Sequence, residues 1–266
     1  MLKKYFAIYR YMFIRTLQFR TELVIYIILD MLPFFVLFFI WQAVFSDQET
    51  INSLTLPEVT QYYVLVMFIE RFISTHFESW RAREVREGKI DYFLTRPFSF
   101  INEIFSKDVG GKLVSLAISL PSFLLFFLLI RVVMPVAPLS LTPTLIFFFI
   151  LFMIAAYLMQ FMIALWIVLL TFWFEGSGGF EHFKWITITL FSGAMLPVAF
   201  MPEWLETVYT ALPFKFMYAV PIMYVQGTMH LSFSLVAHLA TSLLVMAAFT
   251  QFLWSRAVYK YSSAGG

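Results

Sequence analysis

The chain has 266 residues, of which 61% are hydrophobic and only 13% are charged, and its formal net charge is +2. A soluble domain usually carries roughly 25% charged residues, so this composition is typical of a membrane protein. The small net charge gives no electrostatic reason to expect a nucleic-acid partner. The absence of cysteine excludes disulfides and thiolate metal sites.

Six apolar runs approach the ~20 residues that a membrane-spanning helix requires. They cover residues 23–45, 59–77, 113–134, 143–173, 183–200 and 233–254. No internal repeat or long linker separates a second domain. The sequence therefore predicts one all-α domain over residues 1–266, a polytopic membrane protein with six transmembrane helices.

The distribution of lysine and arginine predicts the orientation of these spans. Basic residues are frequent in residues 1–20 and in residues 78–112, whereas the connections at 46–58, 135–142 and 201–232 hold only Lys215. Since basic loops remain on the cytoplasmic side, both termini and residues 78–112 are expected there. The other three connections are expected on the outside.

Residues 1–22 place Lys3, Lys4, Arg10 and Arg15 within one arc of a helix and an aromatic group on the opposite arc. This pattern favours an amphipathic helix that lies in the cytoplasmic membrane interface. The alternative is a simple basic flank that orients the first span.

The segment at 78–100 follows the second span. Helical spacing predicts ion pairs from Arg81 to Glu84 and from Arg83 to Glu87, and Gly88 is a candidate C-terminal cap. An apolar tip then follows among charged residues, and Pro97 fixes its exit. We expect this segment to dock on another cytoplasmic protein, and the alternative is a solvated loop that touches the membrane. The candidate docking residues are Arg83, Glu84, Glu87, Gly88, Lys89, Ile90, Asp91, Phe93, Leu94, Arg96 and Pro97.

The outer segment at 191–227 contains four prolines, which no single spanning helix tolerates at that density. Pro202 suits the start of a short amphipathic helix, and Pro213 ends it. Because broken backbone at membrane depth must be satisfied by protein or water, this segment is predicted to be a re-entrant cap over a pathway. A plain extracellular loop is the alternative.

Candidates for a transport pathway combine ionisable residues inside spans with the soft, aromatic outer segment. For Asp30 a buried polar contact between helices is the alternative, and for the outer residues it is lipid contact or core packing. The candidates are Asp30, Glu70, Met195, Pro197, Phe200, Pro202, Trp204, Pro213 and Phe214.

Motifs for catalysis and cofactor binding are not found. The glycines near Lys112 lack the spacing of a phosphate-binding loop, and the four histidines are scattered without metal-ligand spacing. No GxSxG elbow occurs. We therefore expect no catalytic residues, no directly bound cofactor and no metal site, and we expect the chain not to be an enzyme.

The basic N-terminal segment, the pattern from Glu84 to Phe98 and the run from Ser192 to Phe214 together resemble the six-span permeases of ABC exporters of the second type. The bacterial subfamily whose permeases are often encoded as adjacent pairs is the most similar. The resemblance covers nearly the whole chain. It implies a multi-pass permease subunit in the plasma (inner) membrane of a bacterium.

This resemblance also implies the partners. A second permease, either an identical copy or a paralogue, would complete the pathway, and two ATPase subunits would supply ATP and Mg²⁺ binding. The segment after the second span would be the coupling helix, with Phe93, Leu94 and Arg96 transmitting the ATPase motion. The aromatic and methionine content favours an apolar, amphipathic or lipid-linked substrate.

Two other classes of function remain open at this point. An ion- or proton-coupled membrane carrier would work without a partner and would use Asp30, Glu70 or Glu175 as titrating groups. A membrane-embedded lipid enzyme would need histidine, aspartate or serine side chains that converge at one depth, and the sequence contains no recognisable constellation of that kind.

Overall fold

The computed structural model describes residues 20–94, 99–139, 142–174 and 176–261, together with Arg10, Tyr11, Ile14 and Gln18. The described side chains exclude those of residues 20–24, 26–28, 30 and 94. Most of the expected interfacial helix at 1–22 therefore lies outside the described residues, as do Arg96, Pro97 and Glu175 and the side chains of Asp30 and Leu94.

The prediction of an almost entirely helical fold is confirmed, because the described strands amount to one two-residue hairpin. In chain order the elements are α2 (Arg20–Val44), β1 (Thr50–Ile51), β2 (Leu54–Thr55), α3 (Leu56–Ile73), α4 (Glu78–Arg86), α5 (Asp91–Leu94), α6 (Phe100–Val133), α7 (Pro143–Leu170), α8 (Gly178–Phe191), η1 (Val198–Phe200), α9 (Glu203–Ala211), η2 (Pro213–Phe216), α10 (Ala219–Val225) and α11 (Phe233–Lys260).

Among the described residues, three helices are both long and apolar enough to cross a membrane: α6, α7 and α11. The apolar part of α2 covers Met31–Val44. Helix α3 has 18 residues but carries Glu58, Glu70 and Arg71. These three charges explain why α3 is the least apolar of the long helices by sequence.

The third and fifth predicted spans differ most from the observed helices. The third begins at Phe100 instead of residue 113, because the Ser99 hydroxyl accepts the Asn102 backbone N–H and caps the first turn. The fifth, predicted at 183–200, is helical only to Phe191. Its 14 residues extend roughly 21 Å, which is less than the ~30 Å hydrocarbon layer, so the chain beyond Phe191 must contribute to any crossing.

Helix α7 lies at the centre of the molecule. It contacts α3, α4, α8, α10 and α11, and most of its residues from Phe152 to Leu169 are buried. A helix that is apolar all round is suited to such a position. The main hydrophobic core therefore forms around α7, with buried side chains from α2, α3, α6 and α10.

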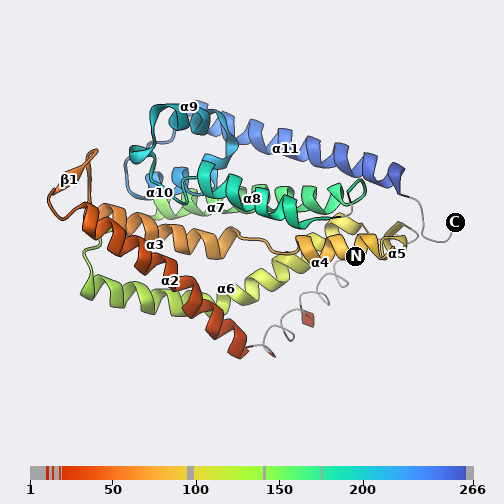
Figure 1. The fold of residues 1–266 in the computed structure, drawn as a ribbon, viewed down its shortest axis with the longest axis horizontal. Helices are drawn as coiled ribbons and strands as arrows, with labels where there is room; N and C mark the ends of the chain where they lie inside the picture. Colours follow the sequence, from red (N-terminus) through yellow and green to blue (C-terminus); the bar gives the residue numbers. More distant parts are fainter. Residues whose placement is uncertain are drawn as a thin grey trace.

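The molecule has two distinct ends. Figure 1 shows β1 and α9 toward one end and α4, α5 and the last turns of α11 toward the other. At the first end, Asn52 donates to the Ala199 carbonyl at 2.9 Å, the Ala137 N–H donates to the Pro57 carbonyl at 3.1 Å, and Gln226 donates to the Glu58 carbonyl at 3.0 Å. The connection at 46–58 is thus joined to both of the other connections predicted to be outside.

The segment at 191–227 is broken, as its prolines predict, and α9 runs between Pro202 and Pro213 as expected. Its polar backbone is satisfied by two adjacent tyrosines of α3. The Tyr62 hydroxyl donates to the Gly193 carbonyl at 2.6 Å, and the Tyr63 hydroxyl donates to the Met195 carbonyl at 2.9 Å. Residues 216–220 are fully buried beside α3 and α7, so this part enters the core.

Gly193 is required at this junction. It has a φ of +88°, and an added Cβ would lie 2.6 Å from the Ala219 Cβ and 2.9 Å from the Tyr62 hydroxyl. We predict that Gly193→Ala lowers the free energy of unfolding by about 3 kcal/mol, from left-handed strain and overpacking together. Thermal unfolding of the purified protein in mild detergent measures this.

The matched control is Gly227→Ala, because Gly227 also has a positive φ of +72° but no atom within 4 Å of the added Cβ. Its cost is expected to be about 1 kcal/mol, from backbone strain alone. Equal losses of unfolding free energy in the two variants would show that Ala219 and Tyr62 leave room for a methyl group at Gly193.

Candidate functional site

Helix α4 presents one face to the protein and one to solvent. Its buried residues are Glu78, Arg81, Ala82 and Val85, at i, i+3, i+4 and i+7. Val85 joins a second hydrophobic cluster formed by α4, α6, α7 and the end of α11. The inward face therefore contains two charged residues, which need partners inside the protein.

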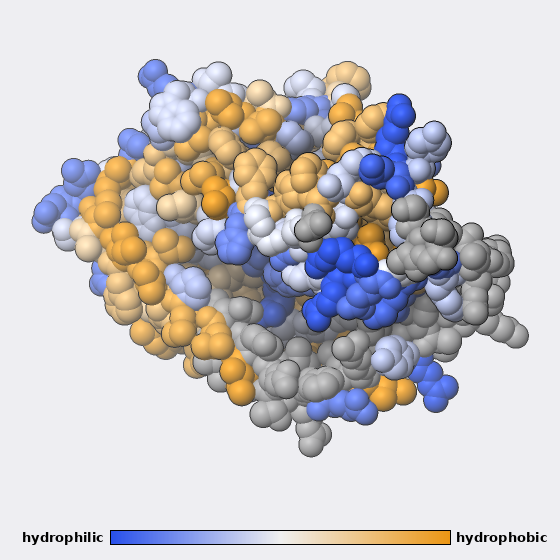
Figure 2. Space-filling view, turned by 45° about the vertical axis from the view of Figure 1, so that its right-hand side comes forward, coloured by the Kyte–Doolittle hydropathy of each residue, from blue (hydrophilic) through white to orange (hydrophobic). Residues whose placement is uncertain are grey.

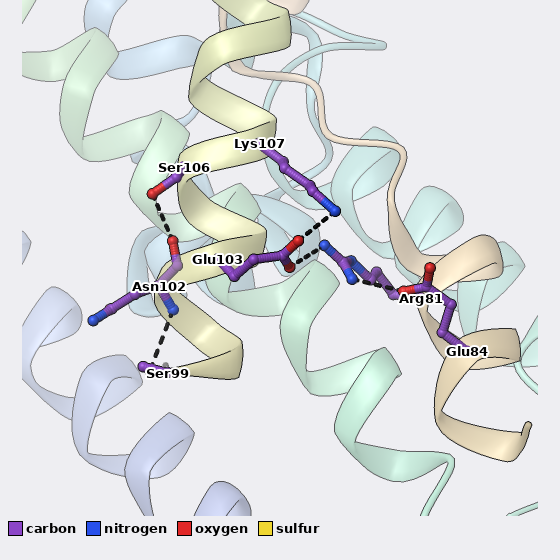
Figure 3. A network of polar contacts seen from close by, with 7 residues as sticks. All are labelled: Arg81, Glu84, Ser99, Asn102, Glu103, Ser106 and Lys107. Carbon is purple, nitrogen blue, oxygen red and sulfur yellow. Dashed lines mark hydrogen bonds and ion pairs between the residues drawn. The ribbon is translucent and has the colours of Figure 1, made fainter. Parts of the chain in front are cut away.

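Arg81 is the centre of a buried ion network and is only 1% exposed. Its Nη1 lies 2.6 Å from a Glu84 carboxylate oxygen, which confirms the predicted i,i+3 pair, and its Nη2 contacts Glu103 of α6. Glu103 also pairs with Lys107 one turn later. Figure 3 shows this chain of contacts crossing from α4 to the first turns of α6.

Aromatic rings complete the environment of the Arg81 guanidinium. Its carbon lies 4.2 Å from the Trp80 ring centroid and 5.9 Å from that of Phe100. A delocalised guanidinium is suited to such stacking. Phe100 in turn stacks on Trp254 of α11, with centroids 5.7 Å apart. The position of α4 is thus tied to α6 by charge and to α11 through Phe100.

Two lysines hold the connection between α3 and α4. Lys112 of α6 donates to the Ser74 carbonyl, and Lys184 of α8 donates to the Thr75 carbonyl at 3.2 Å. Lys184 also pairs with Glu78. These contacts satisfy backbone carbonyls where the helix is interrupted, and they attach the start of α4 to both α6 and α8.

The predicted cap at Gly88 is present, with a φ of +74°. The Gly88 N–H donates to the Val85 carbonyl at 3.1 Å and the Lys89 N–H donates to the Glu84 carbonyl at 3.0 Å, which is the Schellman arrangement. The hydroxyl of Tyr261, the residue that follows α11, donates to the Gly88 carbonyl at 3.3 Å. The end of α4 is therefore fixed as firmly as its beginning.

The apolar tip expected to face outward is instead turned inward. Ile90 is only 1% exposed, and Phe93 packs edge to face on Phe100 with centroids 5.3 Å apart. Burial of apolar side chains in the cluster below α4 explains this difference. Ile90 and Phe93 support the segment from inside, and the side chains that face solvent are charged except for Tyr92.

The exposed part of this segment, which we call the α4 rim, consists of Arg83, Arg86, Glu87, Lys89 and Tyr92. Glu87 was expected to pair with Arg83, but its carboxylate lies 2.6 Å from the Lys89 ammonium. This hydrogen bond lowers the pKa of Glu87 and raises the pKa of Lys89. In Figure 2, where the α4 end is turned forward, the largest group of hydrophilic side chains lies right of the centre, and hydrophobic ones cover much of the left and upper surface.

The candidate pathway residues separate into two groups. Met195, Pro202 and Trp204 are exposed near the hairpin end, while Pro197 is buried and Pro213 and Phe214 are half-buried. Phe200 lies against Trp41 of α2, with centroids 4.5 Å apart. Glu70 is far from these in the chain and is exposed near the other end of α3.

Two cavities meet at Glu70. One of about 260 Å³ is bounded by α3, α7 and α8, and another of about 490 Å³ is bounded by α2, α3 and α6. Both are lined by Glu70, Ser74, His76 and Trp185. The sequence marked Glu70 but missed Trp185 and Gln160, because only the fold brings α7 and α8 to this point.

The chemistry of the site is polar contact and ion pairing. Across the described residues, no group of three or more histidine, aspartate or glutamate side chains could hold a metal ion. What the arrangement provides is a mechanical link, because a charged rim on α4 is tied by buried ion pairs to α6 and α8.

Comparison with known proteins gives one match. A family model described as ABC-2 family transporter protein matches residues 31–265. Searches of curated proteins and of solved structures found no match. The match covers every described helix from the apolar part of α2 onward, including α4 and the segment at 191–227.

The buried Arg81 pair yields a test of how α4 is held. We predict that Arg81→Ala lowers the free energy of unfolding by about 3 kcal/mol, because the buried Glu103 carboxylate loses one of its two cationic partners and keeps only Lys107. Arg83→Ala, on the exposed face of the same helix, is expected to change it by no more than about 0.5 kcal/mol. Denaturation of both purified variants measures the difference.

A compensating variant separates loss of charge from loss of packing. Arg81→Met with Glu103→Gln removes both charges and keeps most of the volume, so it is expected to recover stability relative to Arg81→Ala. If Arg81→Ala were no less stable than Arg83→Ala, the ion pair would not be what holds α4.

Proposed function

Because this chain belongs to the ABC-2 transporter family, we propose that it is the permease subunit of an ATP-driven exporter and that the α4 rim receives its ATPase. Family membership makes it a multi-pass ABC permease, a membrane subunit that is not itself the ATPase and that works with ATP-binding subunits. The export direction, the coupling site and the substrate class are the proposed part.

The observation that carries the proposal is the way α4 is built. A nine-residue helix is marginal on its own, yet α4 is held by ion pairs to α6 and α8 and exposes a charged rim. A surface loop does not need such anchoring. A helix needs it if it must transmit force from a partner to the membrane helices.

The transmission route follows from the same contacts. A partner bound at the α4 rim moves α4, and the Arg81–Glu103 pair carries this movement to α6. The Glu78–Lys184 pair carries it to α8. Phe93, expected from the sequence to contact the ATPase, acts here through its packing on Phe100, and Leu94 and Arg96 are assigned to the same coupling segment.

The proposed assembly has two such permeases, identical or paralogous, and two ATPase subunits that bind ATP and Mg²⁺. It lies in the inner membrane of a bacterium with both termini in the cytoplasm. The excess of lysine and arginine in residues 78–112 over the hairpin end supports this orientation. Six crossings, with α8 and the broken segment after it forming the fifth, agree with both termini on one side.

The proposed substrate is an amphipathic or lipid-like molecule, and the segment at 191–227 is the proposed outer gate. Burial of residues 216–220 between α3 and α7 supports a re-entrant role. Exposed Met195 and Trp204 offer an apolar, adaptable rim at that end. In the proposed mechanism this gate moves when the two permease halves rotate as rigid bodies.

The assignment of the α4 rim is tested by charge reversal. We predict that Arg83→Glu with Arg86→Glu abolishes copurification of the ATPase in mild detergent, with at least a ten-fold loss of substrate-stimulated ATP hydrolysis in proteoliposomes. Both side chains are exposed, so the fold is expected to stay intact, and reversed charges repel a surface that complements arginine.

Arg256→Glu is the matched control, since Arg256 is also exposed but lies near the end of α11. It is expected to leave assembly and ATP hydrolysis unchanged. Normal coupling in the double variant would place the ATPase contact elsewhere. Transport by the lone chain without any ATPase would favour an ion- or proton-coupled carrier instead.

A further inference from the structure

The smaller of the two cavities at Glu70 is lined by more polar than apolar residues. Carboxylates reach it from α3, α4 and α8, through Glu70, Glu78 and Glu181. Lys184 and His76 are the basic groups among its described lining residues. When His76 is neutral, the three carboxylates outnumber the one cation, Lys184, so the lining carries a net negative charge.

Buried acceptor atoms without partners are concentrated in this cavity. Among the described residues, five buried side-chain atoms have no hydrogen-bond partner, and three of them belong to lining residues: Thr75 Oγ1, Gln160 Oε1 and Glu181 Oε1. Gln160 is only 4% exposed, on a helix that is otherwise apolar. Buried polar atoms are nearly always hydrogen-bonded in folded proteins, so a missing donor is indicated here.

The nearby cation does not supply that donor. Lys184 is engaged by Glu78 and by the Thr75 carbonyl. The second oxygen of Glu181 accepts from the Ser79 hydroxyl at 2.6 Å, which leaves this carboxylate without a described basic partner. Carboxylate and amide oxygens accept hydrogen bonds and cannot donate them. The ligand that suits them is a cation with several N–H groups.

The adjoining cavity has the opposite character. It shares Glu70, Ser74, His76 and Trp185 with the polar one, so the two spaces meet along α3. The rest of its lining comes from α2, α3 and α6 and is largely apolar, with Met31, Phe34, Leu37, Met67 and Phe123 among its residues. Its polar members are Tyr63, Ser119 and Arg71, and Arg71 is the one cation among its described lining residues. A polar space of about 260 Å³ thus adjoins a larger apolar one of about 490 Å³.

We infer that these paired cavities bind an amphiphile with a primary ammonium head, its head against Gln160, Thr75 and Glu181 and its apolar chain against α2 and α3. A neutral apolar molecule would leave the buried acceptors unpaired, and an anion would be repelled by Glu181. Its role as the transported substrate rests on the proposed function. Its binding in these cavities is independent of that function.

Alkyl probes of one chain length test the inference. The protein is purified with whatever accompanies it, placed in lipid nanodiscs, and titrated with radiolabelled dodecylammonium, with protein-free nanodiscs subtracted. Dodecyltrimethylammonium has the same charge but no N–H donor, and dodecyl sulfate has the opposite charge. Dodecylammonium is expected to bind at least about ten-fold more tightly than either, as charge-assisted hydrogen bonds require.

Variants of the lining sharpen the result. Gln160→Leu and Glu181→Gln are each expected to weaken dodecylammonium binding about ten-fold, and Gln160→Glu is expected to strengthen it. A gain of affinity cannot come from misfolding. The matched control is Gln251→Leu on α11, where the side chain is exposed, and it is expected to leave binding unchanged.

Equal binding of the three probes, or no response to the lining variants, would overturn the inference and leave the cavity as a site for internal water only. The measurement uses no ATP. If the ATPase fails to copurify while the probe pattern holds, the proposed function is wrong and the binding site stands. If coupling holds while the probe pattern fails, only the binding site is wrong.

Discussion

A guanidinium buried away from water needs a carboxylate partner, and the α4 end of this protein is arranged around that requirement. Arg81 is buried, so α4 can lie only where Glu103 of α6 reaches it, while Glu84 of α4 itself supplies the second carboxylate. That position brings Glu78 to Lys184 and places Val85 and Ile90 over the same hydrophobic cluster.

The backbone carbonyls on either side of α4 accept hydrogen bonds from other parts of the chain. Lys112 and Lys184 donate to the carbonyls of Ser74 and Thr75, and Tyr261 donates to that of Gly88. What remains exposed is the charged rim to which we assign the ATPase.

The sequence was sufficient to predict those features of the structure that residues close together in the chain determine. The Gly88 cap, the Arg81–Glu84 pair and the helix between Pro202 and Pro213 all depend on spacings of a few residues, and all are present.

The burial of Arg81 and Ile90 was not predicted, because their partners lie on α6, α7 and α11. The helical spacing of Glu78, Arg81, Ala82 and Val85 could have predicted this burial, because residues at i, i+3, i+4 and i+7 lie on one face of a helix. Two of the four are charged, and the face is buried nonetheless. Hydropathy likewise extended the fifth span past Phe191, because it measures apolarity and not the satisfaction of the backbone.

The backbone carbonyls of Gly193 and Met195 illustrate how a membrane protein accommodates an interruption at depth. In a lipid environment an unpaired carbonyl is costly, and here two consecutive tyrosines of α3 supply the donors. Adjacent residues of a helix point about 100° apart, so Tyr62 and Tyr63 reach carbonyls two residues apart on a chain that is no longer helical. The same helix carries Glu70 at its other end, between the two cavities. One helix therefore supports the proposed gate and borders the proposed binding site.

Helix α6 gives this arrangement a mechanical meaning. Its 34 residues form a rod of roughly 50 Å, and Glu103, which receives Arg81, lies in its first turn. A displacement of α4 is therefore applied at the extreme end of a lever, where a given force produces the largest torque. Pro121 lies inside the rod, at a point where a helix bends most readily. In the proposed coupling, a bend at Pro121 lets the two halves of α6 tilt by different amounts. A movement applied at one membrane face then reaches the other with a different amplitude.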